Sequence, residues 1–109
     1  MKIENLETFI VDSWLITKIT TDNGLIGVGE STFFGWPRAA EEVVRSFREY
    51  LMGKDPLNVE HHWNFMYRSK SMRGGSIVGG ISSIDQALWD IKGKYFDTPV
   101  WQLLGGKVR

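Results

Sequence analysis

Residues 80–105, GISSIDQALWDIKGKYFDTPVWQLLG, are the stretch of this sequence that decides its fold. Apolar side chains recur at intervals of four and three residues through its first half, which is the spacing of one buried face of a helix. Pro99 prevents the helix from continuing, because proline lacks an amide donor and clashes with the preceding turn. The pattern predicts a helix over about 77–96. Its apolar positions are Ile77, Ile81, Ile84, Leu88, Ile91 and Tyr95.

Two further helices are predicted upstream, over about 37–52 and 56–70. Apolar and charged residues alternate there with helical periodicity. Pro37 and Pro56 suit the first position of a helix, where no amide donor is required. Asp55 is a suitable cap for the second of these helices.

The first third of the chain predicts three strands, over residues 2–11, 14–21 and 25–30, because β-branched and aromatic residues are frequent there. Asn23-Gly24 between the last two favours a tight turn in which both residues have positive φ. Gly27 and Gly29 share one face of the third strand, so another element is expected to pack closely against that face. The order predicts one α+β domain over 1–109, a three-stranded antiparallel meander followed by about three helices on one face.

Length and composition limit the possible functions. The chain has 109 residues, far fewer than the roughly 250 of a (β/α)₈ barrel. Its 13 basic and 13 acidic side chains cancel, which leaves no positive field to attract nucleic acid or an anionic membrane. Cysteine is absent, so disulfide and thiolate chemistry are excluded. With no apolar segment of membrane-spanning length and no secretion signal, a cytoplasmic location is expected.

The histidine and lysine pairs do not predict a metal or catalytic site. His61 and His62 are neighbours on a helix and point about 100° apart, so packing or surface roles are expected. Lys92 and Lys94 diverge by about 200° on a helix. Two lysines aimed at one carbon acid would need the spacing of a strand.

The two acidic residues of the last helix are also expected to be structural. Asp85 and Asp90 point about 140° apart, which excludes a paired-carboxylate site. Asp90 is four residues from both Gln86 and Lys94, and such neighbours interact on a helix. Asp85 lies beside the apolar stripe and is expected to be half-buried, in an anchoring salt bridge or as a cap for a neighbouring loop.

Three aromatic residues in four positions, at residues 33–36, occupy a connection where polar residues are usual. One interpretation is that they fold back onto the core. The other is that they form an apolar flap that covers a ligand or another domain.

Residues 80–105 resemble the N-terminal signature of the mandelate racemase/muconate lactonizing branch of the enolase superfamily. The shared features are a small-residue start, an acidic residue, Ala-Leu-Trp-Asp, a Gly-Lys pair, then Pro and Leu-Leu-Gly. Gly80 replaces the usual alanine and is expected to weaken the helix start only slightly. Residues 21–30 resemble the second hairpin of that family. Four segments are most similar to sugar-acid dehydratases of the galactonate or gluconate type: Tyr67-Arg68, Arg73-Gly74-Gly75, residues 84–94 and residues 99–103.

The resemblance implies an enolase N-terminal-like capping domain and, in the whole enzyme, a (β/α) barrel that this chain lacks. The barrel would carry the Mg²⁺ ligands and the Lys or His groups that remove the proton α to a carboxylate, before the β-hydroxyl leaves. No catalytic residue or metal ligand is therefore expected in this chain, and the segment alone is expected to be inactive. The implied partners are its own barrel domain, a small carboxylate (sugar acid) substrate and further copies in a homo-oligomer.

The resemblance also implies two loops over the barrel mouth, one between the first two strands and one after the third. The first loop is short, which leaves room for a polyol acid. The implied substrate-capping residues are Asp12, Ser13, Trp14, Thr32, Phe33, Phe34, Gly35 and Trp36. The alternatives are the cap of a racemase or cycloisomerase of the same family, or a stand-alone binding module without catalytic activity.

Overall fold

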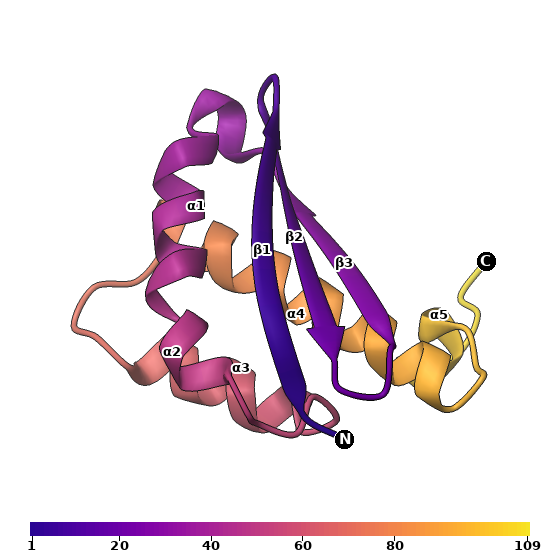
Figure 1. Ribbon diagram of the computed structural model, residues 1–109. Helices are drawn as coiled ribbons and strands as arrows, with labels where there is room; N and C mark the ends of the chain where they lie inside the picture. The colour runs from indigo at the N-terminus through magenta and orange to yellow at the C-terminus, as the bar shows by residue number, and fades with distance from the viewer.

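The computed structural model describes residues 1–109, in which one three-stranded sheet is covered by helices on a single face (Figure 1). The strand order is β1-β2-β3 and both pairings are antiparallel. The predicted α+β class is confirmed. The elements are β1 (Ile3–Val11), β2 (Trp14–Thr21), β3 (Ile26–Ser31), the 3₁₀ turn η1 (Phe33–Gly35), α1 (Pro37–Ser46), α2 (Arg48–Leu51), α3 (Val59–Arg68), α4 (Gly75–Tyr95) and α5 (Val100–Leu103).

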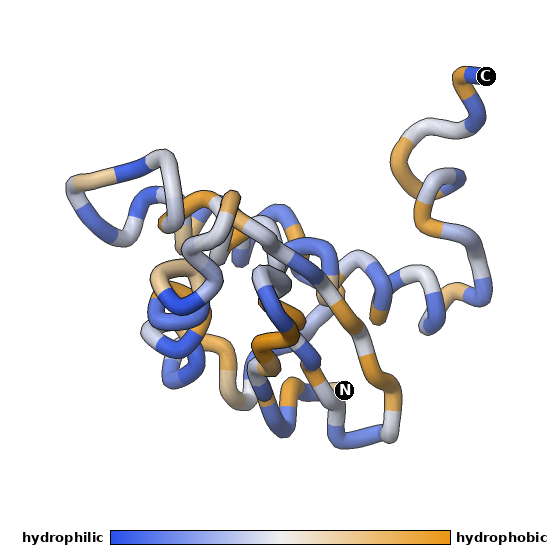
Figure 2. Tube along the Cα trace, turned by 90° about the horizontal axis from the view of Figure 1, so that it is seen from above, coloured by the Kyte–Doolittle hydropathy of each residue, from blue (hydrophilic) through white to orange (hydrophobic).

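The core lies between the sheet and the helices, mainly α1 and α4, and α2 and α3 add Leu51, Val59 and Met66 to it. Residues of β2 alternate between buried and more exposed positions, as expected for a sheet covered on one face. Figure 1 shows α4 crossing behind the sheet while α1 lies beside β1. From above, the segment after α4 extends away from this core (Figure 2). No helix has the length and apolar character needed to span a membrane.

The apolar stripe predicted for the last helix is confirmed in its middle. Ile81, Ile84, Leu88 and Ile91 are fully buried in the core. The prediction is wrong for Tyr95, which is 49% exposed because the last turn of α4 lies outside that buried face.

The close packing predicted at the glycines of β3 is confirmed. A Cβ atom added to Gly27 would overlap the carbonyl oxygen of Ala87, and one added to Gly29 would overlap that of Ser83. The backbones of β3 and α4 therefore approach one another more closely than any larger residue would permit.

The small effect of Gly80 on the helix stays a prediction, but Gly80 does not mark the helix start, because α4 begins five residues earlier, at Gly75. Gly80 instead lies inside the helix and faces α1. An added Cβ would lie 2.7 Å from the Cβ of Val43 and 2.9 Å from the carbonyl oxygen of Ala40. Glycine at this position allows α1 and α4 to pack closely.

The expected two-residue turn at Asn23-Gly24 is also wrong. Gly24 has a φ of +87°, whereas Asn23 is not in the positive-φ region. The Gly24 amide donates to the Thr21 carbonyl at 3.0 Å, and the Thr21 amide donates to the Leu25 carbonyl at 2.9 Å. These bonds describe a three-residue loop, a type I turn followed by a glycine bulge.

The upstream helices are shorter than the sequence predicts. The first is divided into α1 and α2 at Phe47. The second begins at Val59, because Asp55 caps a turn ahead of it. The Asp55 Oδ1 atom accepts the Leu57 amide at 2.9 Å, which is the hydrogen bond of an Asx turn.

The approach of α4 to β3 can be tested by adding one methyl group. We expect Gly29→Ala to lower the free energy of unfolding by about 3 kcal/mol or more, or to prevent folding, since rigid backbone atoms must move. Gly79→Ala on α4 is the control, because its nearest neighbour is the movable Ser31 Oγ at 3.2 Å. This control is expected to change stability by less than about 1 kcal/mol. Urea unfolding measures both, and equal stabilities would contradict the account.

Candidate functional site

The two loops proposed from the sequence lie at the same end of the sheet (Figure 1). One is Asp12–Trp14, which comprises the two-residue turn between β1 and β2 and the first residue of β2. The other is the segment Thr32–Trp36 between β3 and α1, and together we call them the loop edge. Both contribute to a hollow of about 520 Å³. Its lining consists of Ile10, Asp12, Ser13, Gly35, Trp36, Pro37 and Arg38.

The backbone of the loop edge is strained. Asp12, Phe33 and Phe34 have φ values of 55°, 37° and 46°. Apart from Asp97, they are the only non-glycine residues of the chain with positive φ. This conformation costs about 1–2 kcal/mol for a residue with a Cβ, and such strain concentrates at functional sites.

The three aromatic side chains of the second loop point in different directions. Phe33 packs toward the start of α4, where its Cζ atom would lie 3.4 Å from a Cβ added to Gly75. Phe34 is 96% exposed and Trp36 is 69% exposed. Phe33 is therefore the ring that folds back, toward α4, while the interpretation of the other two rings as a flap over a ligand or another domain stays a prediction.

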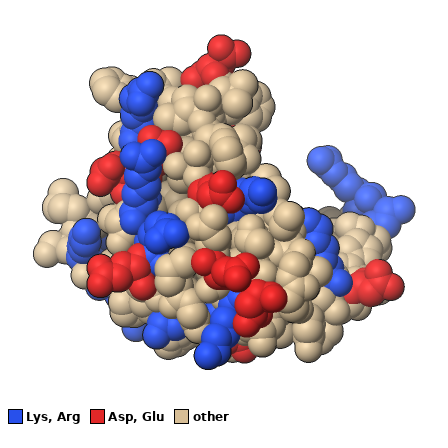
Figure 3. Space-filling view, viewed as in Figure 1, with Lys and Arg blue, Asp and Glu red and all other residues tan.

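The apolar surface of the loop edge continues onto the open face of the sheet. Phe9, Val11 and Trp14 lie on that face and are 45%, 59% and 50% exposed. Figure 3 shows mainly uncharged atoms over the upper part of this face, with most charged side chains lower down or to the left. The open face of the sheet beside the loop edge is thus an apolar surface with few charges.

The histidine pair lies elsewhere and is structural. His62 is buried, and its Nε2 atom lies 2.7 Å from the Asp55 carbonyl oxygen. This contact makes Nε2 the donor, so Nδ1 accepts the Tyr50 hydroxyl at 2.8 Å. Burial lowers the pKa of His62, which favours the neutral ring. The packing role expected for His62 is confirmed, while His61 is exposed.

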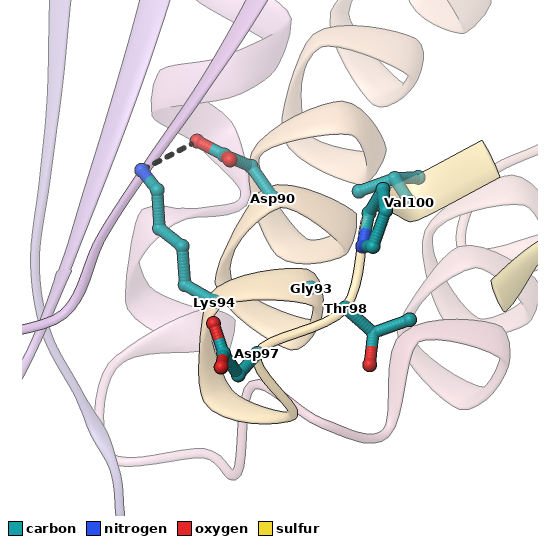
Figure 4. A pocket seen from close by; sticks show the side chains of 7 residues that line it. Asp90, Gly93, Lys94, Asp97, Thr98 and Val100 are labelled. Atoms are coloured by element: carbon teal, nitrogen blue, oxygen red, sulfur yellow. Dashed lines mark hydrogen bonds and ion pairs between the residues drawn. The ribbon is translucent and has the colours of Figure 1, made fainter. Parts of the chain in front are cut away.

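The lysine pair also has no common target. Lys92 Nζ donates to the Leu57 carbonyl at 3.3 Å, whereas Lys94 Nζ lies 2.9 Å from Asp90 Oδ2. The expected neighbour relation of Asp90 and Lys94 is confirmed. Figure 4 shows Asp90 and Lys94 beside a hollow at the end of α4, which has a volume of about 310 Å³. The sequence indicated no site at this position.

Asp85 is half-buried, and its side chain makes no hydrogen bond or ion pair within the chain. Its expected role in a salt bridge or cap is therefore wrong. Burial, and to a smaller extent the carboxylate of Glu60 on α3, raises the pKa of Asp85 to about 6. The residue lies on the side of α4 that faces α3 and does not belong to the loop edge.

The loop edge supplies shape and polarity rather than a metal centre. No group of three or more His, Cys, Asp or Glu side chains in the chain is arranged to hold a metal ion. Asp12 and Arg38 place one negative and one positive side chain at the hollow, and Ser13 adds a hydroxyl group. Such a lining can bind a small polar molecule by hydrogen bonds while Trp36 covers it.

Arg38 also lines the hollow, although the sequence did not single it out. The signal that could have found it is its position directly after Pro37, at the start of the helix that follows the aromatic run. A side chain there lies beside the loop edge rather than along the middle of the helix.

Comparison with known proteins places the chain in one family. Residues 5–105 match the family described as "Mandelate racemase / muconate lactonizing enzyme, N-terminal domain". The D-galactonate dehydratase of Cronobacter sakazakii is 48% identical over 111 residues, which cover 100% of this chain and 29% of that protein. The D-galactonate dehydratase of Variovorax paradoxus is 49% identical with the same coverage. The chain therefore spans about 29% of the length of these relatives.

Solved structures of the enolase superfamily share the fold. An enolase from Agrobacterium radiobacter, proposed to be a galactarate dehydratase and bound to sodium and L-malate, has a TM-score of 0.92 and 32% identity. The match covers 100% of this chain and 29% of that chain. The 3,6-anhydro-D-galactonate cycloisomerase from Zobellia galactanivorans has a TM-score of 0.90 and 36% identity, covering 97% of this chain and 32% of that one.

The raised pKa of Asp85 predicts a pH-dependent effect on stability. The folded chain binds the Asp85 proton more tightly than the unfolded chain does. Because of this residue, the free energy of unfolding therefore decreases as the pH rises from about 4 to about 6. We expect Asp85→Asn to be more stable than the wild type at pH 7, with the difference shrinking toward pH 4. Urea unfolding across this range measures it.

The difference in the free energy of unfolding between variant and wild type isolates the contribution of Asp85, because the titration of His62 is common to both proteins. Glu60→Gln is expected to give a smaller stabilisation, since Glu60 is the lesser cause of the shift. An Asp85→Asn variant that is less stable at pH 7 would show that the carboxylate is stabilising.

Proposed function

We propose that this chain caps the active site of a Mg²⁺-dependent sugar-acid dehydratase. The proposal follows from its family, because the chain belongs to the mandelate racemase / muconate lactonizing enzyme N-terminal domain family. The observation that carries the proposal is the loop edge, where two strained loops line one hollow. The capping residues are those of Asp12–Trp14 and Thr32–Trp36. The partners are the barrel domain of the same protein and a small carboxylate substrate, in a cytoplasmic homo-oligomer.

The chemistry of the proposed reaction takes place outside this chain. A basic group of the barrel removes the proton α to the substrate carboxylate, and a general acid of the barrel then protonates the β-hydroxyl group, which leaves as water. Mg²⁺ would stabilise the negative charge that develops on the carboxylate. The side chains described above do not form a site for this ion, so we place its ligands in the barrel.

The contribution of this chain is to exclude water. Phe34 and Trp36 project from the loop edge with most of their surface exposed. Large aromatic rings gain free energy when they are covered, so contact with the barrel and the substrate would stabilise them. Removal of water strengthens electrostatic interactions at the reacting carbon.

The polar lining of the hollow favours an aldonic acid as the substrate. The turn between β1 and β2 has only two residues, Asp12 and Ser13, which leaves space for a chain of hydroxyl groups. Asp12 accepts hydrogen bonds from hydroxyl groups and repels a second carboxylate, while Arg38 donates to hydroxyl oxygens. The identity to D-galactonate dehydratases supports this choice.

A second candidate function is the cap of a cycloisomerase. The similarity to the Zobellia galactanivorans cycloisomerase supports it, at nearly the same TM-score as the dehydratase-like enolase. The two candidates share the role of the loop edge and differ in the barrel residues. Product analysis distinguishes them, because dehydration of D-galactonate gives a product that is lighter by one water molecule, whereas a cycloisomerase gives an isomer of its substrate.

Truncation of the projecting rings tests the capping role. In the full-length enzyme we expect Phe34→Ala and Trp36→Ala each to lower kcat/KM for D-galactonate about tenfold or more, because water reaches the reacting carbon. Phe96→Ala, an exposed ring at the end of α4, is the matched control. The isolated chain with Mg²⁺ is expected to dehydrate no aldonate. Unchanged kcat/KM in both loop variants, or activity of the isolated chain, would contradict the proposal.

The charge of the hollow is tested by a change of substrate preference. Asp12→Asn keeps the size of the side chain and removes the repulsion of a second carboxylate. We expect the ratio of kcat/KM for galactarate to that for D-galactonate to rise about tenfold, which corresponds to roughly 1.4 kcal/mol. A ratio that stays the same would place Asp12 away from the distal end of the substrate.

A further inference from the structure

The outer edge of β3 is bound by side chains of α4 instead of by a fourth strand. Three residues of α4, spaced four apart, contact the backbone of three residues of β3, spaced two apart. The pairs are Gln86 with Glu30, Asp90 with Val28, and Lys94 with Ile26.

The spacing of the contacting residues along α4 nearly equals their spacing along β3, which allows three successive contacts. Two residues of a strand span about 6.6 Å, and four residues of a helix span about 6.0 Å. The helix runs antiparallel to the strand, so the last contact on α4 is the first on β3. Gly27 and Gly29 allow the approach that brings these side chains within reach.

Gln86 makes the two hydrogen bonds that a residue of a neighbouring strand would make. Its Oε1 atom accepts the Glu30 amide at 3.0 Å, and its Nε2 atom donates to the Glu30 carbonyl at 3.0 Å. The hydroxyl oxygen of Ser82 accepts a further hydrogen bond from Nε2 at 3.1 Å, which fixes the orientation of the side-chain amide.

Asp90 and Lys94 continue the contact with charged groups. The Val28 amide donates to Asp90 Oδ2 at 3.0 Å. Lys94 Nζ donates to the Ile26 carbonyl at 2.6 Å and to Asp90 Oδ2 at 2.9 Å (Figure 4). Charge-assisted hydrogen bonds of this kind are stronger than neutral ones, so the edge of β3 is held along most of its length.

The end of β3 that Gln86 binds leads directly into the second segment of the loop edge, Thr32–Trp36. Glu30, which Gln86 binds at both backbone groups, is two residues before Thr32. The strained φ values of Phe33 and Phe34 persist only if the ends of the loop are fixed. Pro37 begins α1 and fixes one end, and Gln86 fixes the other.

We propose that Gln86 is a positioning residue that holds the segment Thr32–Trp36 in its capping conformation. The structural part of this inference stands on the contacts above, and its catalytic consequence rests on the proposed function. Asp90 and Lys94 hold the preceding part of β3, at Val28 and Ile26.

The structural part is tested on this chain by NMR relaxation and amide hydrogen exchange. We expect Gln86→Met to increase the exchange rate of the Glu30 amide at least tenfold. Order parameters of the amides at Thr32–Trp36 are expected to fall from about 0.85 to below about 0.6. Gln102→Met is the matched control, since Gln102 is exposed on α5 and its side chain makes no hydrogen bond. Unchanged order parameters in Gln86→Met would overturn the proposal.

A conservative variant covers the case in which Gln86→Met does not fold. Gln86→Glu keeps an acceptor for the Glu30 amide but has no donor for the Glu30 carbonyl, so an intermediate loosening of the loop is expected. A loop as rigid as that of the wild type in this variant, together with faster exchange at Glu30, would also overturn the proposal.

The catalytic consequence is tested in the full-length enzyme. We expect Gln86→Met to raise KM for D-galactonate about tenfold with a smaller change in kcat, while Gln102→Met changes neither. A loosened loop with an unchanged KM would support the positioning role and contradict the proposed capping function. A rigid loop with an unchanged KM would contradict the positioning role alone.

Discussion

The close approach of α4 to β3 is the constraint on which the rest of this structure depends. It exists because Gly27 and Gly29 present bare backbone to the carbonyl groups of Ala87 and Ser83. Any side chain at these positions would push the helix away from the sheet. The approach buries the apolar face of α4 and lets its polar flank bind the edge of β3. One helix thus covers both the face and the edge of the sheet, and the edge is protected from pairing with another chain.

The loop edge depends on the same arrangement. β3 ends at Ser31, and the strained segment follows at once, with Phe33 packed against the glycine-containing start of α4. The turn at Asp12 lies beside this segment because β1 ends, β2 begins and β3 ends at the same side of the sheet. The helix that builds the core therefore also determines where Phe34 and Trp36 project.

Features that follow from local chemistry could be predicted from the sequence. The apolar spacing of 77–96 located the long helix, and the glycine pattern of β3 indicated close packing. The aromatic run at 33–36 indicated an unusual connection. These inferences need only the residues of one element, and the structure agrees with them.

Features that depend on two elements could not be predicted in this way. Gln86 is an ordinary polar residue on a helix until β3 is known to lie beside it. Arg38 reaches the hollow only because α1 begins at the loop edge. The pKa of Asp85 depends on Glu60, which lies on another helix. The turn at Asn23-Gly24 differs because the side chain and backbone of Thr21 bind Leu25 and change the loop length.

The central claim is that the loop edge contacts the substrate. The most direct measurement is a crystal structure of the full-length enzyme with Mg²⁺ and an unreactive D-galactonate analogue bound. The account predicts that Trp36 or Phe34, together with Asp12, lies within about 4.5 Å of the analogue. A structure in which the loop edge faces solvent, with every atom more than twice that distance from the analogue, would contradict it.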